Sequence, residues 1–288
     1  MTDFCVYHKC DLDGMCCAAI VKSILPECEL IPFNYGETFP WDKMDECENL
    51  VMLDVSLPIE DMIRLSKEVS GFVWIDHHIT KINEYNEIKN ANPIKGWRDT
   101  DRAACENAWE FFHPFKPMPL CVNMLGRYDI WKHKGIEGCL EFQYGMRNYN
   151  TEPDSPVWEY VLSEDKEINE NFFKKVSEEG KTILSYQKSM NEQYAKSYAF
   201  EVEFEGHPAI VLNKGGCGSA GFEGVWDKDK YDLMISFILH QNGDKMEYIV
   251  SMYTDKEGID AGSIAKKYGG GGHTQACGFQ CESLPFMK

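Results

Sequence analysis

Two imidazoles and a carboxylate stand together at the end of an apolar run, FVWIDHH, as Asp76, His77 and His78. More acidic residues follow comparable short segments of the chain. They are Asp11 and Asp13 after FCVYHKC, Asp54 after NLVML and Asp129 after LGRY. One aspartate in such a place commonly hydrogen-bonds its own turn, but a repeated arrangement indicates a site. Carboxylates are hard oxygen ligands that suit Mg²⁺ or Mn²⁺, so the pattern predicts metal-dependent chemistry.

The segments that must position these side chains alternate between strand-like and helix-like patterns. In chain order they are FCVYH, GMCCAAIVKSIL, CELIPF, NLVMLDV, IEDMIRLSKEV and FVWIDHH. Strand, helix, strand, strand, helix, strand is the order of an α/β fold, so we expect a largely parallel sheet with crossover helices. Ligands gather at the carboxyl ends of such strands, which predicts a single pocket. Its expected members are His8, Asp11, Asp13, Asp54, Asp76 and His77.

The rest of the chain predicts helices over this sheet and then a second domain. Two helical patterns, AACENAWEFFH and CVNMLGRYDIW, would return Asp129 to the pocket. We expect a catalytic domain over residues 1–162, a helical linker over 163–197 and a smaller α/β domain over 198–288. The apolar periodicity of the linker also suits one more surface helix, which stays the alternative.

The loop HKCDLDG has the composition of an ion-binding turn. Asp11 and Asp13 could address two ions from a tight turn, and Gly14 permits close approach of the backbone where a helix begins. The free N–H groups of that helix would face an anion. The same pattern also occurs in calcium loops and plain turns, although no acidic residue follows at the spacing of an EF-hand.

Composition narrows the classes of partner. The chain has 288 residues and a formal net charge of -18, which repels long polyanions, so a phosphate-bearing substrate should be short. The 12 cysteines include no C-x-x-C pair, which argues against a zinc knuckle and favours reduced thiols in a cytoplasmic protein. Neither a signal peptide nor a membrane span is expected, because no apolar leader or apolar run of about 18 residues occurs.

Five motifs in the chain resemble those of a known family. HKCDLDG, LDVSLP, WIDHH and GRYDIW, in this order, resemble the successive motifs of the DHH phosphoesterases. GGGGHTQACGF resembles the glycine-rich signature of their associated second domain, DHHA1. LDVSLP and WIDHH are most similar to the short members related to nanoRNases, which degrade oligoribonucleotides of a few nucleotides. The resemblance spans nearly the whole chain and implies the same two-domain α/β organisation.

The resemblance implies a site with two divalent cations, with Mn²⁺ favoured and Mg²⁺ the alternative. Its expected ligands are His8 and Asp11 for one ion, Asp13, His77 and Asp129 for the other, and Asp54 as the bridge. Asp76 would orient a neighbouring imidazole, His78 would face the scissile phosphate, and a bridging hydroxide would be the nucleophile. The first motif departs from many members, because His8 precedes Asp11 by three residues rather than four.

Substrate contacts are expected on both domains. In the second domain, Gly270, Gly271, Gly272 and His273 would bind a phosphate of the substrate, as the resemblance implies. Lys214 and Ser219 are weaker candidates, for which a surface turn is the alternative. In the first domain, Arg127 could stabilise charge in the transition state or form a structural ion pair. Arg102, where relatives often carry a small residue, could clasp phosphate.

These expectations converge on a phosphodiesterase that hydrolyses short oligonucleotides to mononucleotides. The same site could instead serve a cyclic dinucleotide, a 3′-phosphoadenosine phosphate or pyrophosphate, since all need the same ions. A polynucleotide exonuclease is disfavoured by the negative charge, and a non-catalytic nucleotide-binding protein is disfavoured because all the motif carboxylates are present. A homodimer stays open, as do cleavage polarity and the choice between RNA and DNA.

Overall fold

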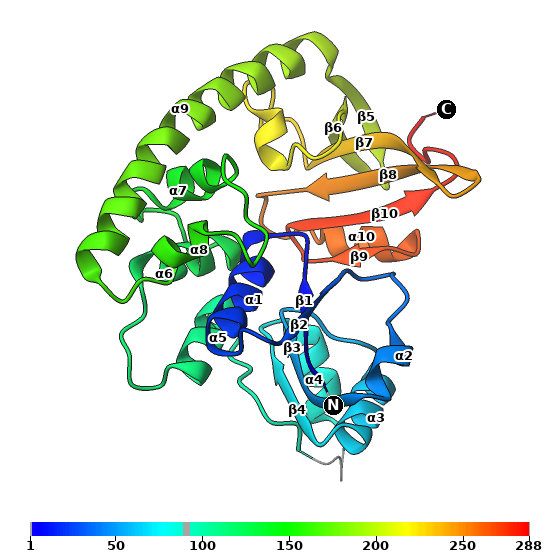
Figure 1. The fold of residues 1–288 in the computed structure, drawn as a ribbon. Coiled ribbons are helices and arrows are strands. Elements are labelled where there is room, and N and C mark those ends of the chain that lie inside the picture. Colours follow the sequence, from blue (N-terminus) through cyan, green and yellow to red (C-terminus); the bar gives the residue numbers. More distant parts are fainter. Residues whose placement is uncertain (1, 89–92, 288) are drawn as a thin grey trace. The chain divides into compact units, whose positions relative to one another are not determined.

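The computed structural model describes residues 2–88 and 93–287 of the chain. The chain divides into two compact units, Met1–Ile183 and Leu184–Lys288. The division falls inside one continuous helix, α9 (Lys166–Tyr198), which therefore belongs to both units (Figure 1). The predicted fold class, a parallel-sheet domain joined by a helix to a smaller α/β domain, is confirmed.

The first unit is built on a parallel sheet of four strands. These are β1 (Thr2–His8), β2 (Glu29–Phe33), β3 (Cys47–Leu53) and β4 (Gly71–Ile75), in the spatial order β2-β1-β3-β4. The register pairs Tyr7 with Leu53 and Leu53 with Ile75, so the three strands end side by side. Whatever follows them in sequence must therefore gather at one edge of the sheet.

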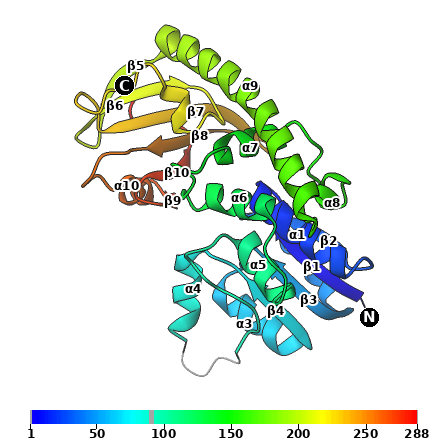
Figure 2. The ribbon, with the colours of Figure 1, turned by 90° about the vertical axis from the view of Figure 1, so that its left-hand side faces the viewer.

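Helices cover both faces of this sheet (Figure 2). The helices of this unit are α1 (Leu12–Ile24), α2 (Trp41–Met44), α3 (Ile59–Glu68), α4 (Ile79–Asn86), α5 (Ala104–Phe112), α6 (Leu120–Asp129), α7 (Cys139–Met146) and α8 (Val157–Val161). The period of two along β1 sorts its side chains, with Cys5 and Tyr7 packing in one core and Phe4 and Val6 in the other. Helices α1 and α5 contribute to the first core, and α3 contributes to the second.

The start of α1 is pressed against the end of β1. A Cβ atom placed on Gly14 would lie 2.0 Å from the carbonyl oxygen of His8, a separation that no side chain tolerates. The pair Cys16 and Cys17 then packs fully buried on the sheet. Small residues at the beginning of α1 therefore allow the strand end and the helix start to share one site.

The second unit has a mixed sheet of six strands. They are β5 (Phe200–Phe204), β6 (His207–Asn213), β7 (Leu233–Asn242), β8 (Lys245–Tyr253), β9 (Gly271–Gly272) and β10 (Ala276–Cys281), in the order β5-β6-β7-β8-β10-β9. Only β6 and β7 run parallel among these pairs. Helix α10 (Ala261–Lys267) packs through Ala261 and Ala265 on one face, and Ala195 of α9 packs on the other. The short 3-10 helix η1 (Ser219–Phe222) follows β6.

None of the helices in the described part of the chain combines the length and the apolar character that a bilayer-spanning segment needs.

Candidate metal centre

The ends of β1, β3 and β4 and the last residue of α6 bring the predicted ligands together. Three groups of side chains have potential ligand atoms within 4.8 Å of one another. They are His8, Asp11 and Asp54; Asp13, His77 and Asp129; and Asp54, His77 and His78. The first two groups contain the two sets that the family resemblance implies for separate ions, and Asp54 connects the first set to His77 of the second.

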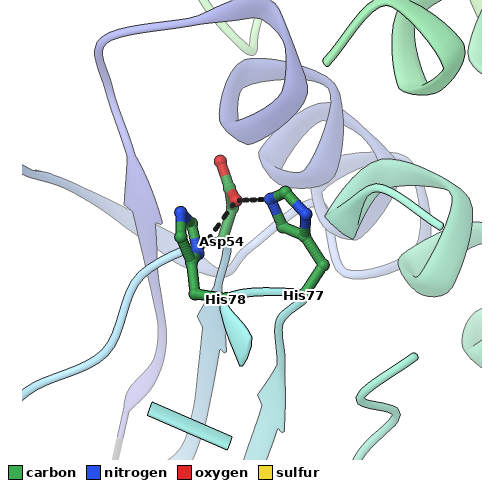
Figure 3. A group of neighbouring side chains, drawn as sticks. All are labelled: Asp54, His77 and His78. Carbon is green, nitrogen blue, oxygen red and sulfur yellow. Dashed lines mark ion pairs between the residues drawn. The ribbon is translucent and has the colours of Figure 1, made fainter. Parts of the chain in front are cut away.

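Asp54 lies between two imidazoles, with one carboxylate oxygen toward each. Its Oδ1 is 3.2 Å from His77 Nε2, and its Oδ2 is 3.4 Å from His8 Nδ1. Figure 3 shows the carboxylate of Asp54 between His77 and His78. The backbone of Asp54 has φ of 57°, the left-handed region, and its N–H donates to the carbonyl of Ile75. This conformation, which non-glycine residues seldom adopt, turns the side chain back over the edge of the sheet.

The two aspartates of the first loop are held by the starts of two helices. Asp11 is the N-cap of α1, where its Oδ1 accepts from the N–H of Gly14 at 3.0 Å. Its Oδ2 is thereby left to face His8 Nδ1 at 3.0 Å. Asp13 is fully enclosed and accepts from the N–H groups of Ala104 and Cys105, at the start of α5. Both carboxylates are therefore rigidly oriented before any ligand arrives.

Asp76 is buried and uses its oxygens inside the protein. Its Oδ1 accepts from the N–H groups of His77 and His78 and lies 2.7 Å from His78 Nδ1, and its Oδ2 accepts from the indole N–H of Trp74. The imidazole that Asp76 orients is therefore that of His78, not that of His77. Because Nδ1 of His78 faces Asp76, its Nε2 is the nitrogen left for a substrate.

The charges of the cluster shift the pKa values of its members strongly. Burial disfavours the charged ring of His8, but the facing carboxylates of Asp11 and Asp54 outweigh it and raise its pKa to about 11. Burial also disfavours the charged ring of His77, but the carboxylates of Asp54 and Asp13 outweigh it and raise its pKa to about 10. Burial and the charge of Asp54 raise the pKa of Asp129 to about 7. Asp54 itself has its pKa lowered to about 2, because the imidazoles of His77 and His8 overcome its burial.

A divalent cation fits this donor set. Among the residues that the structure describes, His8 Nδ1 and Asp54 Oδ1 are buried atoms that form no hydrogen bond. Buried polar atoms are normally satisfied, and those left over point to a missing partner. Carboxylate oxygens with a minority of imidazole nitrogens suit Mn²⁺ or Mg²⁺. Such cations would also offset the repulsion between the negative charges of Asp13, Asp54 and Asp129, which is strong because these carboxylates are buried.

The two first-domain arginines named by the sequence lie in ion pairs. Arg127 is paired with Glu106, a buried residue of α5 that also accepts from the N–H of Ala103 and the amide of Asn123. This geometry corresponds to the structural ion pair that was the alternative for Arg127. Arg102 is partly exposed and pairs with Asp99 at 3.8 Å and Glu110 at 3.4 Å.

The glycine segment of the second unit uses much of its backbone internally. The N–H groups of Gly269, Gly270 and His273 donate to carbonyls of the same unit. A Cβ atom on Gly270 would lie 2.1 Å from the carbonyl oxygen of Gly278, so that glycine is required by packing against β10. Gly271 has open space where a side chain would be, and His273 is exposed. A phosphate site here would rest on Gly271, Gly272 and the imidazole of His273.

Two residues that shape the site were missed by the sequence reasoning. Glu106 lacked a signal, because the position three residues earlier is Ala103 rather than the serine or threonine of a capping box. Asn34 follows β2 and lies 3.3 Å from His8 Nε2 through its Oδ1. An asparagine after a strand is ordinary in a turn, so only the fold could indicate this contact.

A separate cavity of about 550 Å³ lies in the first unit. Its lining includes Tyr149, Tyr160, Phe172 and Lys175 and none of the residues in the three groups above. The chemistry-bearing residues therefore do not line this cavity beside α8 and α9.

Comparison with known proteins supports the fold. No protein-family model matches the chain. The uncharacterised protein R106 of Acanthamoeba polyphaga mimivirus is 26% identical over an alignment of 263 residues that covers 84% of this chain and 56% of that protein. The chain thus spans little more than half the length of this curated relative. The solved structure of exonuclease RecJ bound to manganese matches with a TM-score of 0.50 and 14% identity, over 97% of this chain and 86% of that one.

A further solved structure, the pGpG-specific phosphodiesterase PggH of Vibrio cholerae, matches with a TM-score of 0.47 and 13% identity, over 97% of this chain and 93% of that one. The likeness to RecJ shows the class of fold, an α/β domain on a parallel sheet followed by a smaller α/β domain. The similarity to nanoRNase-like members stays a prediction from the sequence motifs.

Proposed function

We propose that this chain is a phosphodiesterase that hydrolyses short oligonucleotides to mononucleotides with two divalent cations, Mn²⁺ in preference to Mg²⁺. The observation that supports it most is the position of Asp54. One of its oxygens faces the group of His8 and Asp11, and the other faces His77, which also lies 3.4 Å from Asp129. A carboxylate that reaches two ligand sets at once is what a pair of nearby cations requires.

In this proposal His8 and Asp11 hold one cation, Asp13, His77 and Asp129 hold the other, and Asp54 contacts both. When bound, the cations would supply Lewis acidity that polarises a phosphate and lowers the pKa of a bound water. The protein contributes rigid orientation, because Asp11 and Asp13 are fixed by backbone N–H groups. Groups held in place in this way need no reorganisation when the substrate arrives.

His78 has a different role from His77 in this proposal. Its Nδ1 is occupied by Asp76, whose negative charge raises the pKa of the ring despite its burial. A ring that keeps its second proton on Nε2 can donate to a phosphate oxygen and hold charge that develops there. His78 would therefore contact the scissile phosphate rather than a cation.

The charge of the chain and the fold support the proposed substrate class. The net charge of -18 opposes binding of long nucleic acid, which depends on many cationic contacts with phosphates. RecJ, which has the same fold, is an exonuclease and PggH is a phosphodiesterase. In the second unit, Gly271, Gly272 and His273 are proposed to receive a phosphate of the short substrate.

A length series tests the proposed function. The purified chain is assayed with Mn²⁺ and with Mg²⁺ on RNA and DNA from dinucleotides to about 24 nucleotides, alongside pGpG, a cyclic dinucleotide and 3′-phosphoadenosine phosphate. We expect mononucleotide release that is fastest on the shortest oligonucleotides, because long ones meet repulsion. Absence of turnover of the dinucleotides, with turnover of another compound, would reassign the substrate.

Asp54→Asn tests the centre itself. Asparagine tolerates the left-handed backbone that Asp54 adopts, so this variant changes the ligand while preserving the fold. We expect turnover to fall by at least roughly 100-fold, in line with the loss of one precisely placed electrostatic group. Glu60→Gln, at an exposed position of α3, removes the same charge away from the cluster and should leave the rate unchanged. Equal rates in the two variants would refute the proposed centre.

A further inference from the structure

His8 presents its two ring nitrogens to different partners. Its Nδ1 lies 3.0 Å from Asp11 Oδ2 and 3.4 Å from Asp54 Oδ2, and its Nε2 lies 3.3 Å from Asn34 Oδ1. A histidine binds a cation only through a nitrogen that bears no proton. The partner of Nε2 therefore decides whether Nδ1, which lies between Asp11 and Asp54, is free to bind a cation.

The hydrogen bond of Tyr35 settles which end of the Asn34 amide faces His8. The backbone N–H of Tyr35, which can only donate, lies 2.8 Å from the atom assigned as Asn34 Oδ1. That atom must be the oxygen, since an amide nitrogen could not accept there. An oxygen can only accept from His8 as well, so Nε2 carries a proton, and the proton that the ring gives up to bind a cation is the one on Nδ1.

A ring of contacts holds Asn34 in this orientation. The N–H of Asn34 donates to Glu37 Oε2 at 3.0 Å, and the other oxygen of Glu37 binds Lys9 at 2.6 Å. Lys9 is the residue after His8, and its own N–H donates to the carbonyl of Phe33, the residue before Asn34. These contacts thus tie the end of β1 to the loop after β2 on both sides of the His8 to Asn34 contact.

We propose that Asn34 is a positioning residue that fixes the tautomer of His8, so that Nδ1 is the nitrogen offered to a divalent cation between Asp11 and Asp54. This inference rests on the proposed metal centre and adds a residue outside its ligand set. If Asn34 served only the turn after β2, its contact with the N–H of Tyr35 would be enough, and its contact with the imidazole of His8 would not be needed. The partner of a ligating histidine commonly changes cation affinity by about 10- to 100-fold when it is removed.

The test compares Asn34→Ala, which removes the acceptor, with Asn34→Asp, which keeps an oxygen toward His8. Asn49→Ala, at the opposite end of the sheet where the amide contacts Asp3, is the matched control. Calorimetric titration with Mn²⁺ measures the affinity of each site. We expect Asn34→Ala to weaken one of two sites by about 10- to 100-fold, and Asn34→Asp and Asn49→Ala to bind as the natural chain does.

Nitrogen NMR of the His8 ring in the Mg²⁺-loaded protein provides a readout independent of turnover. We expect the proton on Nε2 in the natural chain and in Asn34→Asp, and loss of that single tautomer in Asn34→Ala. Unfolding temperatures measured without cations report on the fold alone, where Asn34→Ala should lose only what the contact with the N–H of Tyr35 contributes. With cations, it should also lose part of the stabilisation that their binding adds. Two sites of natural affinity in Asn34→Ala would overturn the inference alone, whereas a natural chain that binds no cation would overturn the proposed function with it.

Discussion

Asp54 keeps its side chain at the centre of the cluster through a backbone conformation that most residues avoid. The left-handed φ of 57° and the hydrogen bond from its N–H to Ile75 aim a buried carboxylate at His8 and His77. Strain of this kind persists only where the surrounding structure enforces it, and it concentrates at functional sites. Burial and the charge of Asp54 raise the pKa values of Asp13 and Asp129, so the cluster is poised to exchange protons for cations.

Proton release on cation binding follows from these residues. The pKa values of about 11 at His8 and about 10 at His77 keep both rings protonated at pH 7.5 in the cation-free protein. Ligation requires the neutral ring, so binding must displace about two protons, with a further fraction from Asp129 at about 7. Affinity for Mn²⁺ should therefore rise with pH. Titration calorimetry in buffers of different ionisation enthalpy measures the number of protons released on cation binding. A value near zero would contradict the assignment of His8 and His77 as ligands.

At the scale of the elements, an ion pair that includes the buried Glu106 joins helices α5 and α6. Glu106 of α5 contacts Arg127 of α6 and accepts from the N–H of Ala103. A Cβ atom on Gly126 would lie 2.5 Å from the Glu106 side chain, so the two helices approach closely at this point. The same helix α5 presents its first N–H groups to Asp13, and α6 ends at Asp129. The ion pair therefore positions the two elements that complete one ligand set.

Glu106→Gln should destabilise the fold by about 3–5 kcal/mol, because Arg127 would be left as a largely buried charge without its carboxylate partner. Glu110→Gln on the same helix, which removes a surface ion pair with Arg102, should cost less than about 1 kcal/mol. Urea unfolding of the two variants measures the difference. Equal stability would show that the Glu106 contact does not hold α5 and α6, and would return Arg127 to its proposed role at the substrate.

At the scale of the whole molecule, the excess of acidic residues decides how the chain meets nucleic acid. With 47 acidic and 29 basic residues, the long-range field repels phosphates, and binding must come from local contacts and from cations. A protein that follows long nucleic acid displaces many counterions and loses about 10³- to 10⁵-fold in affinity between 50 and 200 mM salt. This chain lacks the charge for that behaviour.

We therefore expect the binding of oligonucleotides to depend only weakly on salt concentration. The KM for an oligonucleotide of about 24 nucleotides should change by less than roughly tenfold over the same salt range, and it should not fall below the KM for a dinucleotide. Initial rates at fixed Mn²⁺ concentration measure both quantities. A steep loss of affinity with salt, or much tighter binding of the longer chain, would indicate a polynucleotide exonuclease instead.

Much of the architecture was predictable from local pattern. The alternation of apolar segments predicted β1, α1, β3, α3 and β4 in the correct order, because side-chain periodicity reports the type of element directly. The parallel arrangement then placed the residues after those strands at one edge of the sheet. The assignment of particular ligands to particular cations, and the domain boundaries within residues 163–197, stay predictions.

The sequence by itself determined the α/β class, the sheet edge where the acidic residues and histidines gather, and the unfavourable field for long polyanions, because these depend on periodicity, chain order and composition. Only the tertiary structure decided which atoms meet. It placed the side chain of Asp76 against His78, that of Arg127 against Glu106 and that of Asn34 against His8. It also placed the carboxylate of Asp54 between the imidazoles of His8 and His77. Such pairings depend on side-chain direction and helix approach between residues as far apart in the sequence as His8 and Asp54, which no local pattern encodes.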